Sequence, residues 1–157
     1  MNLFRAIVTT VSDRCSRGEQ EDLSGPILVT TLRETGAEVV ESLVLSDDLD
    51  PLADTLRSLA ARPDIDLIVT TGGTGFGPRD NTPEATRAVI EREAPGLAEA
   101  MRAASPKGML SRGVCGICGD TLIVNLPGSP TAVRESFAVI KPVLSHAIKL
   151  IGGDTRH

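Results

Sequence analysis

The chain has 157 residues, of which 41% are apolar and 24% are charged, and its formal net charge at pH 7 is −5. This length predicts a single domain, residues 1–157, with a full hydrophobic core. Tyr and Trp are absent, which argues against stacking on bases, and the acidic balance argues against general nucleic-acid binding. No long apolar segment and no signal-peptide pattern occur, which favours a cytoplasmic protein with no membrane partner.

Apolar β-branched runs alternate along the chain with segments of helical spacing. The apolar run 4–11 is typical of a strand that is buried on both faces of a sheet. The expected elements after it are a polar loop at 12–24, a helix at 24–34, a strand at 38–45, a helix at 49–61, a strand at 65–71, helices from 82 and at 96–104, strands at 113–118 and 121–126, and a helix from 130. The expected N-caps are Ser24, Thr82 and Ser129. Pro142 is expected to kink or divide the last helix.

This order of elements predicts an α/β fold with three layers, in which helices cover both faces of a mostly parallel, Rossmann-like sheet. The Gly119-Asp120 turn predicts a short hairpin in the C-terminal part. In such a sheet, ligands bind beyond the carboxyl ends of the strands. The segments that leave expected strand ends are 12–24, 46–50, 72–80 and 126–130, so we expect them to converge on one edge.

The run TTGGTGFGPRD at 70–80 is the most informative segment of the chain. Closely spaced glycines let backbone N–H groups approach an anion, and a following helix start adds free N–H groups and a positive dipole end. Arg79 and Asp80 place a cation and a carboxylate beside this loop, which suits a phosphate and its Mg²⁺. No lysine follows the last glycine and the spacing is not GxGxxG, which argues against a P-loop NTPase and an NAD(P) dehydrogenase.

The charged residues near this edge also have a purely structural interpretation. Asp80 precedes the expected cap Thr82, where the helix dipole favours a carboxylate. Asp47 or Asp48 is a candidate cap for the helix at 49–61. Three scattered arginines are expected on the solvated surface: Arg14, Arg17 and Arg112.

Three motifs, taken in this order, resemble the molybdenum cofactor biosynthesis proteins of the Mog/MoaB type, the molybdopterin adenylyltransferase family. They are SDR at 12–14 with DLSGP at 22–26, GGTGFGPRDNTPEA at 72–85, and LPGSP at 126–130. The resemblance implies a molybdopterin-binding domain that transfers an adenylyl group from MgATP to molybdopterin, giving adenylyl-molybdopterin and pyrophosphate. It therefore implies Mg²⁺ as the cofactor, and ATP and molybdopterin as the substrates.

The resemblance assigns catalytic, Mg²⁺-binding roles to Asp47 and Asp80. Asp80 lies within an unbroken motif, whereas Asp47 matches only by its strand-to-helix context, which leaves Asp48 as an alternative. Phosphate oxygens are then held by the amides of the glycine-rich segment, with Arg79 as a further donor. The residues implied in substrate and nucleotide binding are Ser12, Asp13, Asp22, Ser24, Gly25, Thr71, Gly72, Gly73, Thr74, Gly75, Arg79, Pro127, Gly128 and Ser129.

Two other functions stay open at this point. The same motifs occur in MoaB-like proteins that bind molybdopterin without strong catalytic activity of their own, and the short segment after the last expected helix favours that branch. A generic nucleotide-binding module with a regulatory role leaves the pterin-family motifs unexplained. The resemblance further implies a homotrimer, or a hexamer built from trimers, and the downstream molybdenum-insertion enzyme as a partner.

Overall fold

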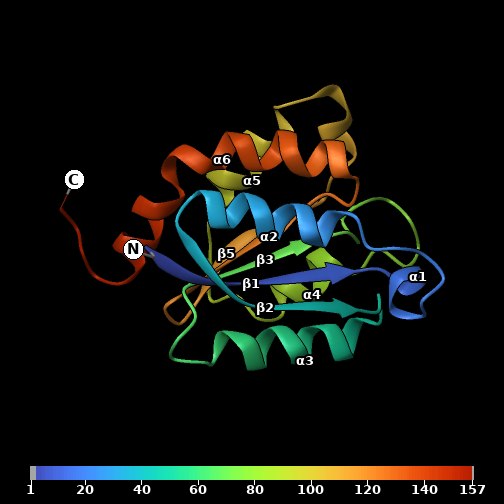
Figure 1. Ribbon diagram of the computed structural model, residues 1–157, viewed down its shortest axis with the longest axis horizontal. Coiled ribbons are helices and arrows are strands. Elements are labelled where there is room, and N and C mark those ends of the chain that lie inside the picture. The colour runs from blue at the N-terminus through green and yellow to red at the C-terminus, as the bar shows by residue number, and fades with distance from the viewer. Residues whose placement is uncertain (1–2, 157) are drawn as a thin grey trace.

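The computed structural model describes residues 3–156 (Figure 1). Its centre is a six-stranded sheet with the strand order β2-β1-β3-β6-β5-β4. The strands are β1 (Phe4–Val11), β2 (Ala37–Leu45), β3 (Leu67–Thr71), β4 (Arg92–Glu93), β5 (Cys115–Cys118) and β6 (Thr121–Leu126). The helices are α1 (Asp13–Ser16), α2 (Ser24–Glu34), α3 (Leu49–Ala60), α4 (Thr82–Arg87), α5 (Pro95–Arg102), the 3-10 helix η1 (Pro106–Leu110) and α6 (Pro130–Ile151).

Most of the sheet is parallel. β1 pairs in parallel with β2 and β3, and β3 pairs in parallel with β6. β5 runs antiparallel to β6 and to β4, and the β5–β6 hairpin turns at Gly119 and Asp120. The predicted α/β fold, with its mostly parallel sheet and its short hairpin in the C-terminal part, is therefore confirmed.

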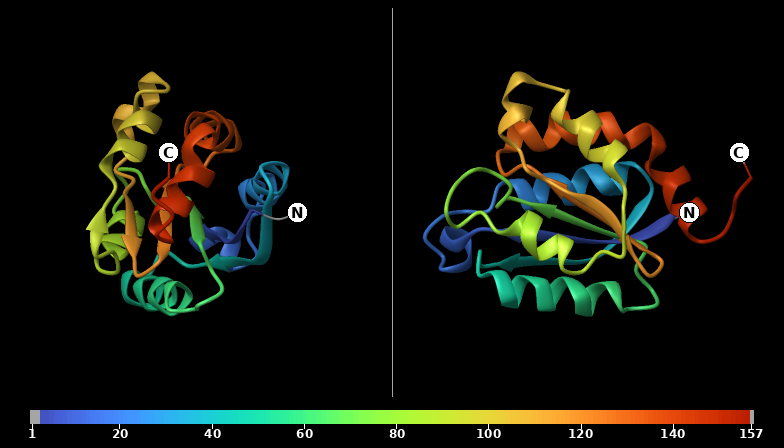
Figure 2. Two further views of the ribbon diagram at one scale, coloured as in Figure 1. Left: turned by 90° about the vertical axis from the view of Figure 1, so that its left-hand side faces the viewer. Right: turned by 180° about the vertical axis from the view of Figure 1, so that it is seen from behind.

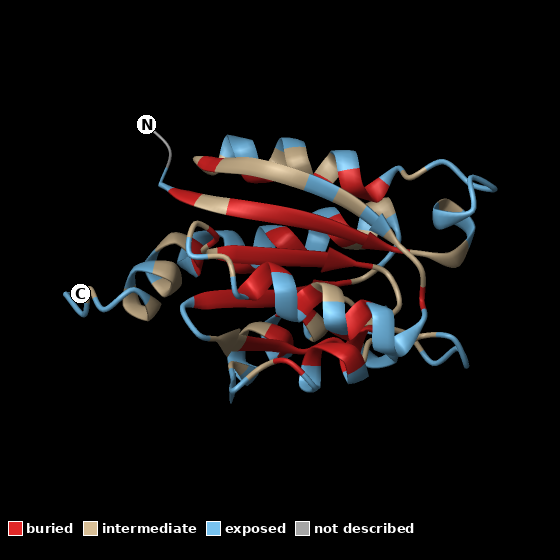
Figure 3. Ribbon diagram, turned by 90° about the horizontal axis from the view of Figure 1, so that it is seen from below, coloured by how far each residue is buried: buried red, intermediate tan, exposed pale blue. Residues whose placement is uncertain are grey.

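Helices cover both faces of this sheet (Figures 1 and 2). Along β1, Ala6 and Val8 belong to the core that packs on α2, α5 and α6. The intervening Ile7 belongs to the core that packs on α3 and α4. Figure 3 shows the result, with buried strands at the centre and helices whose outer sides are exposed. Each buried strand is thus apolar on both faces, as the continuous apolar runs predict.

Two of the three expected helix caps are wrong, and long-range contacts explain both. α2 already includes Ser24, whose hydroxyl donates to Gly128 O at 2.6 Å instead of capping the helix. α4 includes Thr82, whose hydroxyl donates to Gly72 O at 2.9 Å. Ser129 does cap α6, because its hydroxyl accepts an amide hydrogen bond from the first turn at 3.2 Å.

The last helix is not divided by Pro142, since α6 runs unbroken over 22 residues. Pro142 leaves the carbonyl of Ala138 without its helical donor, but both residues lie on the exposed side of α6, where water satisfies such a group. The short elements α1, β4 and η1 were not expected. They span only 4, 2 and 5 residues, which is too short to leave a periodic pattern in the sequence.

The parallel strands bring their carboxyl ends to one edge of the sheet (Figure 1). The segments that leave this edge begin at Ser12, Ser46, Gly72 and Pro127. Backbone hydrogen bonds join them: Ser12 N donates to Leu45 O at 2.9 Å, and Gly72 N donates to Leu126 O at 3.2 Å. The expected convergence is therefore present. Within residues 3–156, no helix has the length and apolar character needed to cross a membrane.

Candidate functional site

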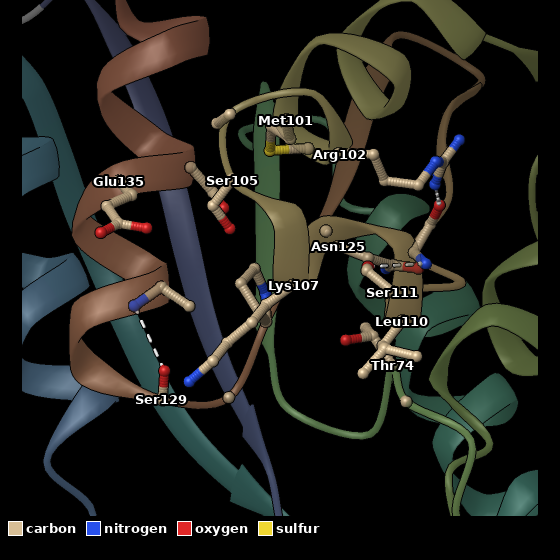
Figure 4. Close-up of a pocket in the computed structure, with 18 of the residues that line it drawn as sticks. Thr74, Met101, Arg102, Ser105, Lys107, Leu110, Ser111, Asn125, Ser129 and Glu135 are labelled. Atoms are coloured by element: carbon tan, nitrogen blue, oxygen red, sulfur yellow. Dashed lines mark hydrogen bonds between the residues drawn. The ribbon is translucent and has the colours of Figure 1, made fainter.

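Two neighbouring cavities open at this edge. The first, of about 450 Å³, lies between the glycine-rich loop (residues 72–80), η1 and the start of α6 (Figure 4). The second, of about 300 Å³, lies between the same loop and the segments that follow β1 and β2. The residues that line both cavities are Gly73, Asp80 and Gly128. Two compartments with a common wall suit two ligands that have to meet.

The glycine-rich loop turns backbone amides toward free space. Gly73 has a φ of 68°, a conformation that residues with a Cβ rarely adopt. Within residues 3–156, the amides of Gly73, Thr74 and Gly75 donate no hydrogen bond, so they are free to bind an anion. The amide of Gly72 was also expected to bind phosphate, but it donates to Leu126 O and so extends the β3–β6 pairing.

Asp47 is a buried carboxylate with an unused oxygen. It follows β2, and only 8% of it is exposed. Its Oδ2 accepts a hydrogen bond from Asp13 N at 2.9 Å, whereas its Oδ1 is buried and has no hydrogen-bond partner among the described residues. A Cβ added to Gly73 would stand 3.0 Å from this Oδ1, so the oxygen lies against the glycine-rich loop. Burial raises the pKa of Asp47, and the Asp13 amide opposes that rise in part.

Asp80 lies at the wall between the two cavities. Its Oδ2 accepts a hydrogen bond from Gly77 N at 2.8 Å, so the carboxylate folds back over its own loop. A Cβ on Gly75 would stand 2.9 Å from the same oxygen, so a side chain there would displace the Asp80 carboxylate. The charge of Asp80 also contributes to the raised pKa of Asp47. The two carboxylates are therefore near enough to influence one another.

Asp47 and Asp80 have the donor chemistry of a Mg²⁺ site that a phosphate completes. No group of three or more His, Cys, Asp or Glu side chains in the described part of the chain could hold a metal ion. Mg²⁺ is commonly bound through one or two carboxylates together with substrate phosphates and water. A buried oxygen without a partner, such as Asp47 Oδ1, is costly until a cation or donor reaches it. The residues present therefore fit Mg²⁺ that arrives with a phosphate ligand.

Arg79 and Asp13 lie outside both cavities, unlike the position that the sequence led us to expect. The Arg79 guanidinium donates to both carboxylate oxygens of Asp13 at 3.0 Å and to Asp48 Oδ1 at 2.8 Å. These hydrogen bonds hold the pKa of Asp13 and of Asp48 below the ordinary value. Asp13 in turn accepts from Asp47 N at 3.0 Å. Asp48 is thus an exposed partner of Arg79, whereas Asp47 reaches the cavity.

The segment after β1 forms one wall of the second cavity through Ser12, Asp22 and Ser24. Asp22 accepts a hydrogen bond from the Thr10 hydroxyl at 2.8 Å and from Gly25 N at 2.9 Å. Gly25 does not line the cavity. A Cβ at Gly25 would stand 2.6 Å from Thr10 Oγ1, so this glycine lets α2 begin close to β1.

The turn before α6 is held from two sides. Pro127 and Ser129 line the first cavity, and Thr71 lines the second. The Thr71 hydroxyl donates to Pro127 O at 2.7 Å, and Ser24 donates to Gly128 O. The amides of Gly128 and Ser129 donate no hydrogen bond within residues 3–156. The turn therefore offers a second set of free N–H groups opposite the glycine-rich loop.

Several residues in or near the first cavity were missed by the sequence reasoning. Figure 4 shows Lys107 extending from η1 toward the turn that carries Ser129, with Glu135 of α6 on the same side. Arg112, expected on the solvated surface, instead donates to carbonyls of the glycine-rich loop. Asn125 was the available signal, since it is a polar residue inside the apolar strand β6 and it lines this cavity.

Comparison with known proteins identifies the family. Residues 7–146 match the family described as the probable molybdopterin binding domain. The chain is 47% identical over 152 residues to the molybdenum cofactor synthesis protein cinnamon of Drosophila melanogaster, a match that covers 94% of this chain but only 25% of that protein. It is 39% identical over 153 residues to the molybdopterin adenylyltransferase of Helicobacter pylori strain J99, covering 94% of this chain and 87% of that protein.

Solved structures agree with this result. The molybdopterin biosynthesis enzyme MoaB from Thermus thermophilus superposes with a TM-score of 0.91 at 46% identity, covering 96% of this chain and 97% of that chain. The family match runs from β1 into α6, so it includes the glycine-rich loop and both aspartates of the site. The chain therefore belongs to the molybdopterin-binding domain family, among the molybdenum cofactor biosynthesis proteins of the Mog/MoaB type.

Proposed function

We propose that this chain is a molybdopterin adenylyltransferase, which transfers the adenylyl group of MgATP to molybdopterin and releases pyrophosphate. The observation that carries the proposal is the pair of cavities with Gly73, Asp80 and Gly128 in their common wall, because two anionic substrates need one meeting point. The name of the Helicobacter relative supports the same activity. Residues 1–157 then act as one domain that binds both substrates.

In the proposed reaction, a phosphate oxygen of molybdopterin attacks the α-phosphorus of ATP. A new phosphorus–oxygen bond forms while the bond from the α-phosphorus to the oxygen that bridges to the β-phosphate breaks, and pyrophosphate leaves. The attacking oxygen is already ionised at neutral pH, so no side chain has to act as a nucleophile or general base. The barrier comes mainly from alignment and from repulsion between two anions.

The free amides of the site bind the phosphate oxygens in this proposal. Gly73, Thr74 and Gly75 provide one set, and Gly128 and Ser129 provide the other. Further contacts with the substrates come from Ser12, Asp22, Ser24, Thr71 and Pro127. Gly72 lines the second cavity and holds the turn at Leu126, and support from outside the cavities comes from Asp13, Gly25 and Arg79.

Asp47 and Asp80 would hold Mg²⁺ together with phosphate oxygens. When bound, the ion supplies positive charge that offsets the repulsion between the two substrates. Asp47 contributes its unpartnered Oδ1, and hydrogen bonds with Asp13 keep that side chain in place. Asp80 contributes the carboxylate that stands between the two cavities.

A pyrophosphate-release assay with MgATP and molybdopterin tests the proposal. We expect pyrophosphate and adenylyl-molybdopterin in equal amounts, and no release when molybdopterin is left out. Molybdopterin binding without pyrophosphate release would instead support a MoaB-like binding protein. Absence of both binding and release would contradict either function.

We further propose that the protein works in the cytoplasm as a homotrimer, or as a hexamer of trimers, and passes its product to a molybdenum-insertion enzyme. The Mog/MoaB resemblance supports this assembly. Sedimentation equilibrium should give the mass of three or six chains of 16.5 kDa each. A single-chain mass at micromolar concentration would contradict the assembly and leave the chemistry untouched.

A further inference from the structure

Arg112 holds the glycine-rich loop at Gly75 and at Asp80. Its Nε donates to Gly75 O at 2.7 Å, and its Nη2 donates to Asp80 O at 2.7 Å. Its Nη1 donates to Glu84 Oε2 in α4, also at 2.7 Å. The backbone of Arg112 adds a fourth bond, from its N–H to Thr74 O at 2.7 Å. One residue thus ties the loop to α4 and to the segment before β5.

The backbone of the glycine-rich loop has few other long-range hydrogen bonds after Thr74. Its tip is exposed, and the Phe76 side chain is in contact with solvent, with 67% of the residue exposed. The loop's internal bonds are short-range: Gly77 N to Asp80 Oδ2 at 2.8 Å, and Asp80 N to Gly77 O at 3.0 Å. Thr82 holds only the first two glycines, through their carbonyls. The side chain of Arg79 also ties this loop to Asp13 and Asp48, but these ion pairs are exposed and do not hold the loop backbone. Between Gly75 and Asp80, the bonds to the backbone from outside the loop among the described residues come from Arg112.

We propose that Arg112 is a positioning residue, whose guanidinium fixes the spacing between Gly75 and Asp80 and so holds the Asp80 carboxylate at the wall between the two cavities. This inference rests on the proposed function. Arg112 does not itself line either cavity, so it acts through the loop and not on a substrate. Two carbonyls and one carboxylate accept from three different nitrogens of one planar group, a geometry that a lysine ammonium cannot reproduce.

Kinetics of Arg112→Gln and Arg112→Lys test this role. We expect kcat to fall by about 100-fold in both variants, because a displacement of about 1 Å at a reacting group costs that much. The KM for ATP should change by less than about threefold, since an effect confined to kcat marks an interaction that matters in the transition state. A KM effect without a kcat effect, or full rescue by lysine, would overturn the proposal.

Two matched variants separate positioning from general loss of charge. Arg87→Gln removes a guanidinium from the same region. Within residues 3–156 it pairs only with the exposed Glu93, at 3.4 Å, so kcat and KM should stay near those of the unsubstituted protein. Glu84→Gln removes the charged partner of Arg112 but keeps both carbonyl contacts, and should keep most of kcat. If kcat falls as far in Glu84→Gln as in Arg112→Gln, the ion pair between Arg112 and Glu84 is what matters, and the proposal is contradicted.

Amide hydrogen exchange supplies a readout that needs no activity. In Arg112→Gln, peptides that cover 74–82 should exchange at least about tenfold faster, while peptides from β3 and β6 stay protected, because the change is a local opening. Faster exchange throughout the sheet would show a purely structural role and overturn the proposal. If the unsubstituted protein releases no pyrophosphate, the proposed function fails, and the exchange pattern still decides whether Arg112 fixes this loop.

Discussion

Two arginines at opposite edges of the sheet, Arg62 and Arg112, have different kinds of partner. At the opposite edge, Arg62 pairs with Glu41 and Asp64, and these side chains are 35% to 40% exposed. At the carboxyl edge, Arg112 bonds to backbone carbonyls of the glycine-rich loop, whereas Arg79 forms exposed ion pairs with Asp13 and Asp48. Exposed ion pairs of modest strength thus occur at both edges, and at the carboxyl edge Arg112 in addition holds the shape of a backbone segment.

The carboxylates of Asp64 and Asp47 also differ in their partners. Asp64 at the opposite edge accepts hydrogen bonds from Arg62, which lower its pKa. Asp47 at the carboxyl edge keeps an oxygen without a partner, and burial raises its pKa. A protein selected for stability alone would pair such an oxygen. The unsatisfied carboxylate thus marks the edge where a ligand is expected, and the satisfied one marks a structural surface.

The largest expected effect at the carboxyl edge comes from Asp80→Asn. Loss of this charge should lower turnover by at least about 100-fold, equal to about 3 kcal/mol of transition-state stabilisation. The fold should survive, because asparagine keeps an oxygen that can accept from Gly77 N. Pyrophosphate release and a thermal melt measure the two quantities. Activity within threefold of the unsubstituted enzyme would remove Asp80 from the mechanism.

A smaller effect on turnover should distinguish the role of Asp47 from that of its neighbour Asp48. Asp47→Asn should lower turnover by at least about tenfold through weaker Mg²⁺ binding. It should not lower the free energy of unfolding, because it removes a buried charge with an unpartnered oxygen. Asp48→Asn should leave turnover nearly unchanged, since that carboxylate lies on the surface with Arg79. The reverse result would mean that Asp48 is the functional aspartate.

Ser24→Ala should cost stability on the order of 1 kcal/mol. The lost bond, from Ser24 Oγ to Gly128 O at 2.6 Å, joins segments 104 residues apart across the site. Urea unfolding measures the change in free energy, with Ser16→Ala as a control whose hydroxyl bonds only three residues away. Equal losses in the two variants would show that the Ser24 bond has no special part in closing this edge.

The smallest effect is expected at the opposite edge, from Arg62→Gln. Partly exposed ion pairs contribute at most about 1 kcal/mol, so the midpoint of urea unfolding should move little. Turnover should be unchanged, because no cavity of the site includes Arg62. A loss of turnover comparable to that of Asp80→Asn would erase the distinction between the two edges.

The sequence by itself determined the main strands and helices and the place of the candidate site. Apolar runs and helical spacing mark the main strands and helices, because burial on a sheet or on a helix face leaves a local pattern. The glycine-rich loop and Asp80 could also be predicted from a local pattern, because the glycines and the carboxylate lie within one short segment of the sequence. The convergence of segments on one edge followed from the parallel topology.

Only the tertiary structure decided which side chains reach the cavities at the carboxyl edge and which hold its loops in place. It distinguished Asp47 from Asp48 by burial, which two adjacent aspartates do not reveal in sequence. It assigned Ser24 and Thr82 to distant carbonyls instead of helix caps. It also brought Arg112 into contact with the glycine-rich loop, where its partner Asp80 lies 32 residues earlier in the chain. Such partners are far apart along the chain, so no local pattern records them, and only folding brings their atoms within bonding distance.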